Sequence, residues 1–526
     1  MDKLNNFFFS NKLNKISKYI YSFFFGLILV LSFPPYNFWP LIFPSITFLF
    51  FTSYLSKSSK ESFFIGWFFG LAFFGFGLYW VFNSFLIRSN IFIYLLPFCF
   101  IVLSSFLALF IGFVSFLNYK LKKKIIFSII YFSIFWTLSE ILRSYLFTGF
   151  SWNLVAHIWV EFINILQICS ILGVFGLTFL TIIFILSASI FCIRKKFLKK
   201  NENSFFILVF ILFSLSAFFG EIRLKNSTSI IYDSKTFRVV QPNLSQRDKL
   251  NFMKFEKNFK KLLDLSFENK KKSLNTSEKL IILWPETAIM NLNYVISLSL
   301  FKEIKYKLKK GEYIISGALR EEGNTNPKYY NSILVINDKL LPEFIYDKFH
   351  LVPFGEYIPF EKILNKFGLN IINLQKGDNY SKNINYEDIP KFKPLICYEI
   401  IFPDKYTKNS SFLLNFTNDA WFGNTAGPHQ HFVHSIFRAI EEGSQVIRVA
   451  NTGISASIDP FGRIMKKIDL NHEGSFDTKI VTGNSFLNSN TFLKTIYSKY
   501  GNNLIFFILF VLFFVLFDKG KIEKRN

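Results

Sequence analysis

The segment FKPLICYEIIFP, residues 392–403, decides how the polar part of this chain is interpreted, because it places a cysteine directly after a strand-like run. Apolar and aromatic residues precede Cys397, and this composition is typical of a strand. Of the four cysteines, Cys397 alone lies in the long polar stretch between the last two apolar segments. The thiol cannot form a disulfide within its own domain, so it is structural, unmatched or reactive.

Two other segments carry the groups that a reactive thiol needs. Glu286 lies in LIILWPETA (280–288), and Lys348 lies in YDKFHLVPFGEYIP (346–359). A free thiol has a pKa of about 8.5 and is mostly protonated at neutral pH, so it needs a base such as Glu286. A fixed ammonium such as Lys348 would lower the pKa of the thiol and stabilise an oxyanion. We therefore predict that the three side chains share one site.

The positions of these residues in their segments also favour a shared site. In α/β sheets, the carboxyl ends of strands and the loops that follow them build the site. Glu286, Cys397 and the pair Asn418-Asp419 each follow a strand-like run, and Lys348 follows FIYD in the same way.

Strand-like and helical segments alternate in the polar stretch, residues 221–501. The strand-like runs are short, and each stops at Pro, Gly, Asn or Asp. Residues 248–271 and 429–443 have helical character. This alternation predicts one α/β domain of about 280 residues, which is large enough for a single core.

The rest of the chain has the composition of a membrane protein. Hydrophobic residues make up 51% of the sequence and aromatic residues 20%, with 73 phenylalanines, and the excess is concentrated in blocks. Most blocks are long enough to cross about 30 Å of hydrocarbon at about 1.5 Å per residue. We place eight spans at residues 17–33, 39–56, 62–86, 91–118, 125–147, 165–193, 204–220 and 502–517.

Loop charge predicts the orientation of these spans, because Lys and Arg near span ends stay in the cytoplasm. Basic clusters precede span 1 and follow spans 2, 4, 6 and 8, whereas the alternate connections are nearly free of basic charge. Both termini are therefore expected in the cytoplasm, with residues 221–501 outside, between a seven-span region (1–220) and an eighth span with a basic tail (502–526). The clusters are Lys3, Lys12, Lys15 and Lys18; Lys57 and Lys60; Lys120, Lys122, Lys123 and Lys124; Arg194, Lys195, Lys196, Lys199 and Lys200; Lys519, Lys521, Lys524 and Arg525.

Two other kinds of site are disfavoured. The net charge of +24 suggests nucleic-acid binding, but the basic bias is densest beside the spans and no basic helix or stacking platform of a nucleic-acid module is present. His429, His431 and His434 in GPHQHFVH lack a metal-binding pattern such as HExxH and a carboxylate at ligand spacing. We predict no metal, no cofactor and no nucleic-acid partner. No plausible histidine partner for Cys397 is apparent either, which favours Glu286 as the base.

The ordered set of motifs resembles the nitrilase superfamily and its membrane-bound branch, the apolipoprotein N-acyltransferases. The resemblance covers nearly the whole chain and includes the eight spans. Its motifs are SFPPYNFWP (32–40), YWVFNSF (79–85), SEILRSYLFTGFSW (139–152), WPETA (284–288), KFHLVPFGEYIP (348–359), CYEIIFP (397–403), FTNDAWFG (416–423) and RVANTGISASIDPFG (448–462).

That resemblance implies a nitrilase-like αββα sandwich inserted into an eight-helix transmembrane bundle, in the bacterial inner membrane. It implies that Cys397 takes an acyl chain from a phospholipid as a thioester, with Glu286 as general base and Lys348 as oxyanion partner. The α-amino group of the diacylglyceryl-cysteine of an apolipoprotein then accepts the chain, in the last step of lipoprotein maturation.

The resemblance also assigns supporting residues. Glu356, Tyr398 and Glu399 match positions that support the site, Glu356 by orienting Lys348, and Trp421 is expected to line the acyl or substrate entrance.

One segment departs from the family, which often has a Gln-Gly-Asn turn followed by a tryptophan. Here the segment is QPNLSQRDKL (241–250), with Pro242 and Leu250, which affects the grip on substrate and not the reaction class.

Two alternatives stay open at this level. A membrane-tethered nitrilase-type amidase would use the same residues, with water in place of the amine. A transporter or receptor would use the outer domain only to bind a ligand. Transport pathways use intramembrane charges, and Glu140 and Arg143 near the end of span 5 are the main ones among the first seven spans.

Overall fold

The chain divides into two compact units, one made of residues 1–225 with 500–526 and the other of residues 226–499. The computed structural model describes residues 14–88, 91–193, 200–225, 227, 229–268, 279–290, 299–323, 325, 327–340, 342–357, 373–378, 383–386, 389–403, 410–483 and 495–522. The predicted basic positions Lys3, Lys12, Arg194, Lys195, Lys196, Lys199, Lys524 and Arg525 lie outside these residues.

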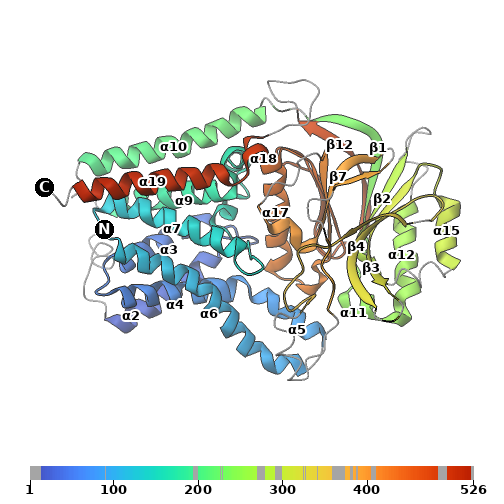
Figure 1. Ribbon diagram of the computed structural model, residues 1–526, viewed down its shortest axis with the longest axis horizontal. Coiled ribbons are helices and arrows are strands. Elements are labelled where there is room, and N and C mark those ends of the chain that lie inside the picture. Colours follow the sequence, from blue (N-terminus) through green and yellow to red (C-terminus); the bar gives the residue numbers. More distant parts are fainter. Residues whose placement is uncertain are drawn as a thin grey trace. The chain divides into compact units, whose positions relative to one another are not determined.

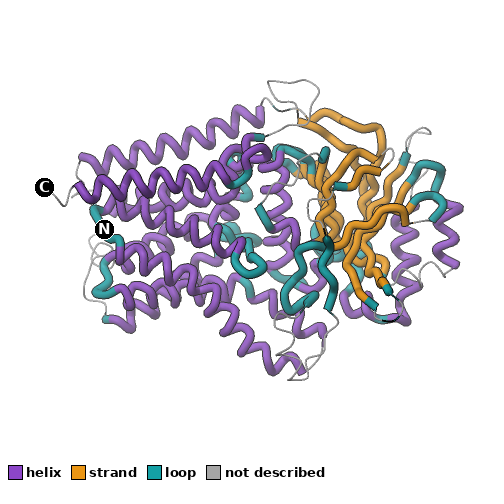
Figure 2. The backbone as a smooth tube through the Cα atoms, in the orientation of Figure 1, coloured by secondary structure: helices purple, strands orange, loops and turns teal. Residues whose placement is uncertain are grey.

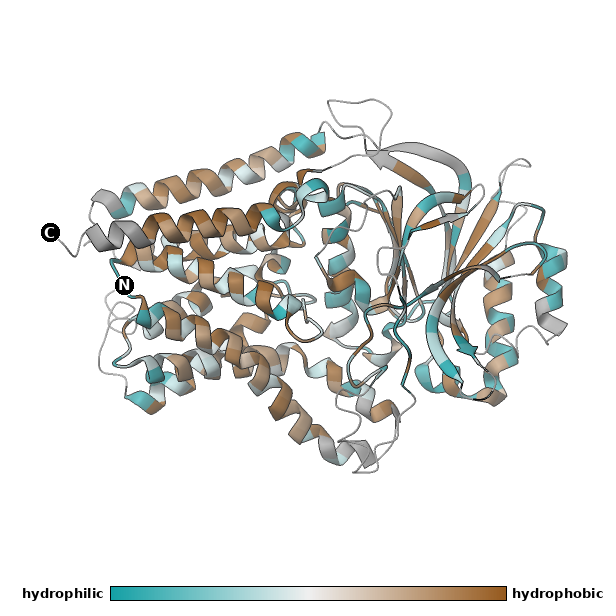
Figure 3. Ribbon diagram, in the orientation of Figure 1, coloured by the Kyte–Doolittle hydropathy of each residue, from teal (hydrophilic) through white to brown (hydrophobic). Residues whose placement is uncertain are grey.

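The first unit is helical, and Figure 3 shows that its helices are mostly hydrophobic. Four of its helical segments are long and apolar enough to cross a membrane: Leu96–Lys120, Ile125–Tyr145, Cys169–Cys192 and Glu202–Lys225. The described helices are α2 (Lys15–Val30), η1 (Trp39–Leu41), α3 (Ile42–Tyr54), α4 (Ser59–Gly77), η2 (Tyr79–Phe82), α5 (Asn83–Arg88), α6 (Ile91–Lys120), α7 (Ile125–Tyr145), η3 (Val155–Trp159), α8 (Ile163–Leu166), α9 (Cys169–Ile193), α10 (Lys200–Lys225), α18 (Ile496–Tyr500), at the boundary of the units, and α19 (Asn503–Ile522).

The other four predicted spans also contain helices, namely α2, α3, α4 and α19. Two of them have short apolar stretches, Trp39–Tyr54 and Asn503–Leu516. None of the four combines the length and the apolar composition of the four long segments. The eight-span arrangement therefore stays a prediction.

The charged pair at the end of α7 is satisfied inside the first unit. The carboxylate of Glu140 accepts hydrogen bonds from the Val155 N–H (2.8 Å) and the Thr178 hydroxyl (2.8 Å). The Arg143 guanidinium donates to the Trp152 carbonyl at 2.6 Å. Both side chains are buried, so they hold the irregular segment after α7 in place and do not face lipid headgroups.

The second unit contains two six-stranded sheets (Figures 1 and 2). The first sheet has the order β12-β1-β2-β3-β4-β5 and the second β11-β10-β9-β8-β7-β6. Its elements are β1 (Ser229–Gln241), α11 (Gln246–Leu250), η4 (Phe252–Lys254), α12 (Phe255–Phe267), β2 (Leu280–Ile289), α15 (Ser299–Lys307), β3 (Tyr313–Glu322), β4 (Lys328–Ile336), β5 (Pro342–Asp347), β6 (Ile384–Tyr386), β7 (Ile389–Ile396), η6 (Cys397–Ile401), β8 (Phe412–Thr417), η7 (Asp419–Trp421), α17 (Ala426–Glu442), β9 (Val446–Ala450), β10 (Ser455–Ile458), β11 (Ile464–Ile468) and β12 (Gly474–Gly483).

The apolar core of this unit lies between the two sheets. Alternate residues of a strand point to opposite faces, so Val239 on β1 packs into the core between the sheets, whereas Val240 packs beneath α12. Phe259 on α12 belongs to the same outer cluster. Helices α12 and α15 cover the outer face of the first sheet, and α17 packs on the second (Figure 1). This is the helix-sheet-sheet-helix order that we predicted.

Strand direction brings the predicted site residues to common sheet edges. In the first sheet β1, β2 and β3 are parallel, and β4 is antiparallel to both β3 and β5. Strand β5 therefore runs in the same direction as β2 and ends at the same edge. In the second sheet β7, β8 and β9 are parallel, so the residues that follow β7 and β8 also share an edge.

Candidate active site

Cys397 lies directly after β7, at the first position of η6, as predicted. Its φ angle is +48°, a left-handed conformation that costs a residue other than glycine on the order of 1–3 kcal/mol. The side chain is buried, and the backbone N–H of Asn418, directly after β8, donates a hydrogen bond to its sulfur. The two neighbouring strands thus hold the thiol in a strained turn with a donor aimed at it.

Glu286 lies in a bulge inside β2, so our prediction that it follows the end of the strand was wrong. Trp284 pairs with Ser316 and Ile289 with Ala318, so the register shifts across the bulge. A bulge bends a strand and re-aims its side chains. A Cβ atom at Gly317, on the neighbouring β3, would lie 2.5 Å from the Cα of Glu286, and a glycine there lets the bulge approach β3.

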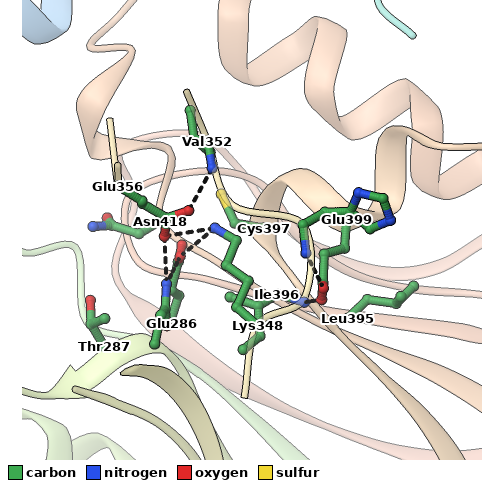
Figure 4. A network of polar contacts seen from close by, with 12 residues as sticks. Glu286, Thr287, Lys348, Val352, Glu356, Leu395, Ile396, Cys397, Glu399 and Asn418 are labelled. Atoms are coloured by element: carbon green, nitrogen blue, oxygen red, sulfur yellow. Dashed lines mark hydrogen bonds and ion pairs between the residues drawn. The ribbon is translucent and has the colours of Figure 1, made fainter. Parts of the chain in front are cut away.

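Lys348 follows β5, as predicted, and its side chain is buried. Its ammonium lies 2.9 Å from Oε1 of Glu356 and 3.5 Å from Oε1 of Glu286. Figure 4 shows these groups converging on the region of the Cys397 sulfur. Burial disfavours the ammonium, but the carboxylates of Glu356 and Glu286 outweigh burial and raise the pKa of Lys348 above its usual value. Lys348 is therefore a permanent cation beside Glu286.

Asn331 links the two carboxylates, and the sequence analysis missed it. Its Nδ2 donates to Oε1 of Glu286 at 2.8 Å and to Oε1 of Glu356 at 2.9 Å. Its backbone carbonyl accepts from the Lys348 N–H at 2.8 Å. The only signal for Asn331 was a polar residue within the apolar strand KYYNSILVI, where strand composition disfavours asparagine.

The thiol of Cys397 is protonated in this environment. Burial, followed by the negative charge of Glu286, raises the pKa of Cys397, and the positive charge of Lys348 opposes this rise. A thiol must lose its proton before it can act as a nucleophile. The arrangement therefore requires a base next to the sulfur, and Glu286 is a carboxylate that interacts electrostatically with it.

Glu399 fastens the segment that carries Lys348 to the segment that carries Cys397. Its carboxylate accepts hydrogen bonds from the Tyr346 hydroxyl at 3.0 Å and from the N–H groups of Phe349 at 2.9 Å and of Ile396 at 2.7 Å. Burial raises the pKa of Glu399, and the hydrogen bond from Ile396 opposes this rise. The predicted supporting role of Glu399 thus has a geometric basis in these contacts.

The remaining predicted residues have less defined surroundings. Tyr398 is buried, with its ring 5.2 Å from that of Phe402. Trp421 is partly exposed at the end of η7, and its place at an entrance stays a prediction. Leu250, at the end of α11, is 52% exposed. Pro242 lies between β1 and α11.

A histidine lies beside Cys397 that the sequence analysis did not place there, but its contacts do not make it a base for the thiol. Nε2 of His431 on α17 lies 3.1 Å from the Cys397 carbonyl oxygen, and Nδ1 lies 2.7 Å from Oδ1 of Asp419. The carbonyl and the carboxylate both only accept, so each contact is a hydrogen bond when the ring nitrogen that faces it carries a proton. Burial, followed by the charge of Arg448, lowers the pKa of His431. Both ring nitrogens are engaged, so His431 supports the backbone of Cys397 and does not face its sulfur as a base.

Cys397, Asp419 and His431 are candidate metal ligands by distance, because each offers a ligand atom within 4.8 Å of the others. The guanidinium of Arg448 already donates to Oδ2 of Asp419 at 2.9 Å and to Oδ1 of Asn415 at 2.5 Å. Despite burial, Arg448 and His431 hold the pKa of Asp419 below its usual value. A metal ion here would meet a fixed positive charge, so these residues fit a metal poorly.

The fold and this thiol site define a carbon-nitrogen hydrolase type of domain, joined to apolar helices. Residues 237–484 match the carbon-nitrogen hydrolase family, and residues 25–187 match the apolipoprotein N-acyltransferase N-terminal domain. The chain is 33% identical over 472 residues to an apolipoprotein N-acyltransferase of Rhodopseudomonas palustris, covering 86% of this chain and 87% of that relative. It is 34% identical to that of Agrobacterium fabrum, covering 88% and 89%. The chain therefore belongs to the apolipoprotein N-acyltransferase family.

Among solved structures, the chain is similar to XC1258 from Xanthomonas campestris, described as a CN-hydrolase superfamily protein. The sequence identity is 17%, the likeness covers 47% of this chain and 90% of that one, and the TM-score is 0.33.

Proposed function

We propose that this protein transfers an acyl chain from a phospholipid to the α-amino group of the N-terminal S-diacylglyceryl-cysteine of apolipoproteins, through a thioester on Cys397. The observation that carries this proposal is the buried thiol of Cys397 beside Glu286 and Lys348. Membership of the apolipoprotein N-acyltransferase family supports the choice of substrates.

In the first step Glu286 takes the proton of the Cys397 thiol, and the sulfur attacks the ester carbonyl carbon of the phospholipid. The ammonium of Lys348 stabilises the tetrahedral oxyanion, because it is held as a cation by two carboxylates. The intermediate collapses with cleavage of the C–O bond. The departing lysophospholipid oxygen takes the proton from Glu286, and the acyl chain stays on Cys397 as a thioester.

In the second step the α-amino group of the acceptor attacks the thioester carbonyl. A thioester is reactive enough to acylate an amine, which makes covalent catalysis by a thiol suitable here. Glu286 takes a proton from the attacking nitrogen, the C–S bond breaks, and the proton returns to the sulfur. The product is an amide on the acceptor, and the enzyme regains its starting state.

The membrane setting belongs to the same proposal. Both substrates carry acyl chains, so an enzyme anchored in the membrane meets both of them there. We propose eight spans with both termini in the cytoplasm of a bacterial inner membrane and residues 221–501 outside. The four long apolar helices and the alternation of basic loops support this arrangement.

The test is the acyl-enzyme itself. Incubated with phospholipid alone, the full-length protein should gain one acyl group on Cys397 that hydroxylamine removes, measured by intact mass. Cys397→Ala should gain none, whereas Cys192→Ala, at an exposed cysteine, should gain it normally.

The roles of the other two groups are tested in the same assay. Glu286→Gln and Lys348→Met should abolish the adduct while the protein remains folded in the membrane, because one lacks the base and the other the oxyanion partner. An adduct that persists in Cys397→Ala, or a normal yield in both of these variants, would refute the covalent mechanism. Release of free fatty acid without any need for an amine would identify a hydrolase.

A further inference from the structure

A second buried lysine lies against the bulge that carries Glu286. Lys249 is on α11, and its side chain is buried. Its ammonium donates to the backbone carbonyl of Glu286 and to the hydroxyl of Thr287, both at 2.7 Å. Thr287 has a φ of +46°, a conformation that needs support from its surroundings. Lys249 therefore holds the irregular backbone at the position that aims Glu286.

The charges of the site also require a second cation. The carboxylates of buried Glu286 and partly buried Glu356 both lie beside the ammonium of Lys348. The three groups leave one excess negative charge, which proton transfer from Cys397 to Glu286 moves onto the sulfur. Buried charges are costly unless they are balanced. The ammonium of Lys249 interacts electrostatically with both Glu286 and Cys397, so it supplies the second positive charge.

The helix that carries Lys249 also reaches the other side of the thiol. Oε1 of Gln246 on α11 accepts a hydrogen bond from Nδ2 of Asn418 at 2.8 Å, and the backbone N–H of Asn418 donates to the sulfur of Cys397. Within the described chain, α11 thus connects the bulge of β2 in the first sheet with the loop after β8 in the second. A shift of α11 would change the surroundings of both the base and the nucleophile.

We propose that Lys249 is a positioning residue for proton transfer from Cys397 to Glu286. Its ammonium fixes the bulge that aims Glu286, and it supplies a second positive charge beside the negative charge that proton transfer moves from Glu286 to the sulfur of Cys397. This inference rests on the proposed roles of Cys397 and Glu286 and assigns a function to α11.

The protonation of Lys249 gives the proposal a pH signature. Burial lowers the pKa of Lys249 to about 8, although Glu286 on β2 and Cys397 on η6 oppose this. On its own element, Asp248 pairs with Lys254 at 2.6 Å. Lys249 is therefore charged below pH 8 and neutral above it, so the support for a thiolate should weaken as the pH rises through 8.

The experiment measures alkylation of Cys397 by iodoacetamide, which needs neither lipid nor amine. The protein is the full chain in detergent, with Cys99, Cys169 and Cys192 changed to Ala so that Cys397 is the only cysteine that can react. The alkylation rate is measured by intact mass from pH 6.5 to 9.5. At pH 7, Lys249→Met should react at least about tenfold more slowly, since about 1.4 kcal/mol is a factor of ten, and Lys249→Arg should stay within about threefold. Lys254→Met, which removes an exposed charge from the same segment, should react normally.

The pH profile separates a charge effect from a loss of shape. The rate of the parent protein should flatten near pH 8, whereas that of Lys249→Arg should keep rising, because the arginine stays charged. Equal rates for Lys249→Met and the parent, equal losses in Lys249→Met and Lys249→Arg, or identical profiles for Lys249→Arg and the parent would each overturn the proposal. The last comparison decides the matter even if Lys249→Met does not fold.

This assay also separates the inference from the proposed function. A protein that shows the Lys249-dependent alkylation but forms no acyl adduct from phospholipid would refute the acyl transfer alone. A protein that forms the adduct but alkylates independently of Lys249 would refute the role of Lys249 alone.

Discussion

Gly317→Ala tests whether the bulge of β2 sets the position of Glu286. A Cβ atom at residue 317 would lie 2.5 Å from the Cα of Glu286, 2.6 Å from the Pro285 carbonyl oxygen and 2.6 Å from the Thr287 nitrogen. All three are backbone atoms, and Cβ contacts under 3.0 Å essentially never occur. The bulge must therefore retreat from β3 by about 0.5 Å or more, the overlap that these distances leave.

That displacement is large on the scale of the site. Strand β3 lies between β2 and β4, so a retreat from β3 also moves Glu286 away from Asn331, which donates to it at 2.8 Å. The contact between Glu286 and Lys348, already 3.5 Å, would be lost. Because a 1 Å misplacement of a reacting group can lower a rate about 100-fold, we expect acyl-adduct formation on Cys397 to slow between about 10- and 100-fold.

The assay is the rate at which the adduct appears with phospholipid alone, measured by intact mass, together with thermal unfolding in detergent. Ala318→Gly is the matched control, because residue 318 packs on the opposite face of β3. That variant should lose about 1 kcal/mol of stability and keep its rate. Adduct formation at the normal rate in a folded Gly317→Ala protein would show that the bulge does not position the base.

Two further predictions concern the groups around the reacting residues. Glu356→Gln removes the carboxylate 2.9 Å from Lys348. Adduct formation should slow about 10- to 100-fold, because the variant lacks a partner that orients a functional group, and Tm should change little. An unchanged rate would exclude an orienting role for Glu356. Arg448→Met removes the guanidinium that pairs with the buried carboxylate of Asp419 and leaves it, among the described residues, only its contact with His431, so the protein should lose about 3–5 kcal/mol. Its Tm should fall clearly, and a second change, Asp419→Asn, should restore part of the loss; an unchanged Tm in the single variant would contradict this account.

The sequence allowed the prediction of those features that depend on local composition and chain direction. Cys397 and Lys348 do follow strands, because apolar runs that end at polar residues predict strand ends. Glu286 was misplaced because a bulge depends on the partner strand as well as on its own residues: the glycine at position 317 permits the close approach of the two strands. Periodicity along one strand carries no such information.

The residues that the sequence analysis missed share a physical reason. Asn331, Lys249 and Arg448 were not singled out, although Lys249 lies in QPNLSQRDKL and Arg448 begins RVANTGISASIDPFG. Each acts on a group that lies far away in the chain. Asn331 lies 45 positions from Glu286, and Lys249 lies 37 positions from it. Which polar residues meet across such distances depends on strand order and register, which one sequence does not reveal.

By itself, the sequence determined that this protein has apolar helices of spanning length, an α/β domain after residue 220 and a cysteine at a strand end, because composition and hydrophobic periodicity are local properties. Only the tertiary structure decided that Cys397, Glu286 and Lys348 meet. It also decided that Asn331 and Lys249 contact Glu286 in the bulge of β2. Glu399 joins the segments that follow β5 and β7, and His431 supports the turn at Cys397. Strand order within each sheet and the packing of the two sheets against one another bring these residues together, and both depend on contacts between segments far apart in the chain.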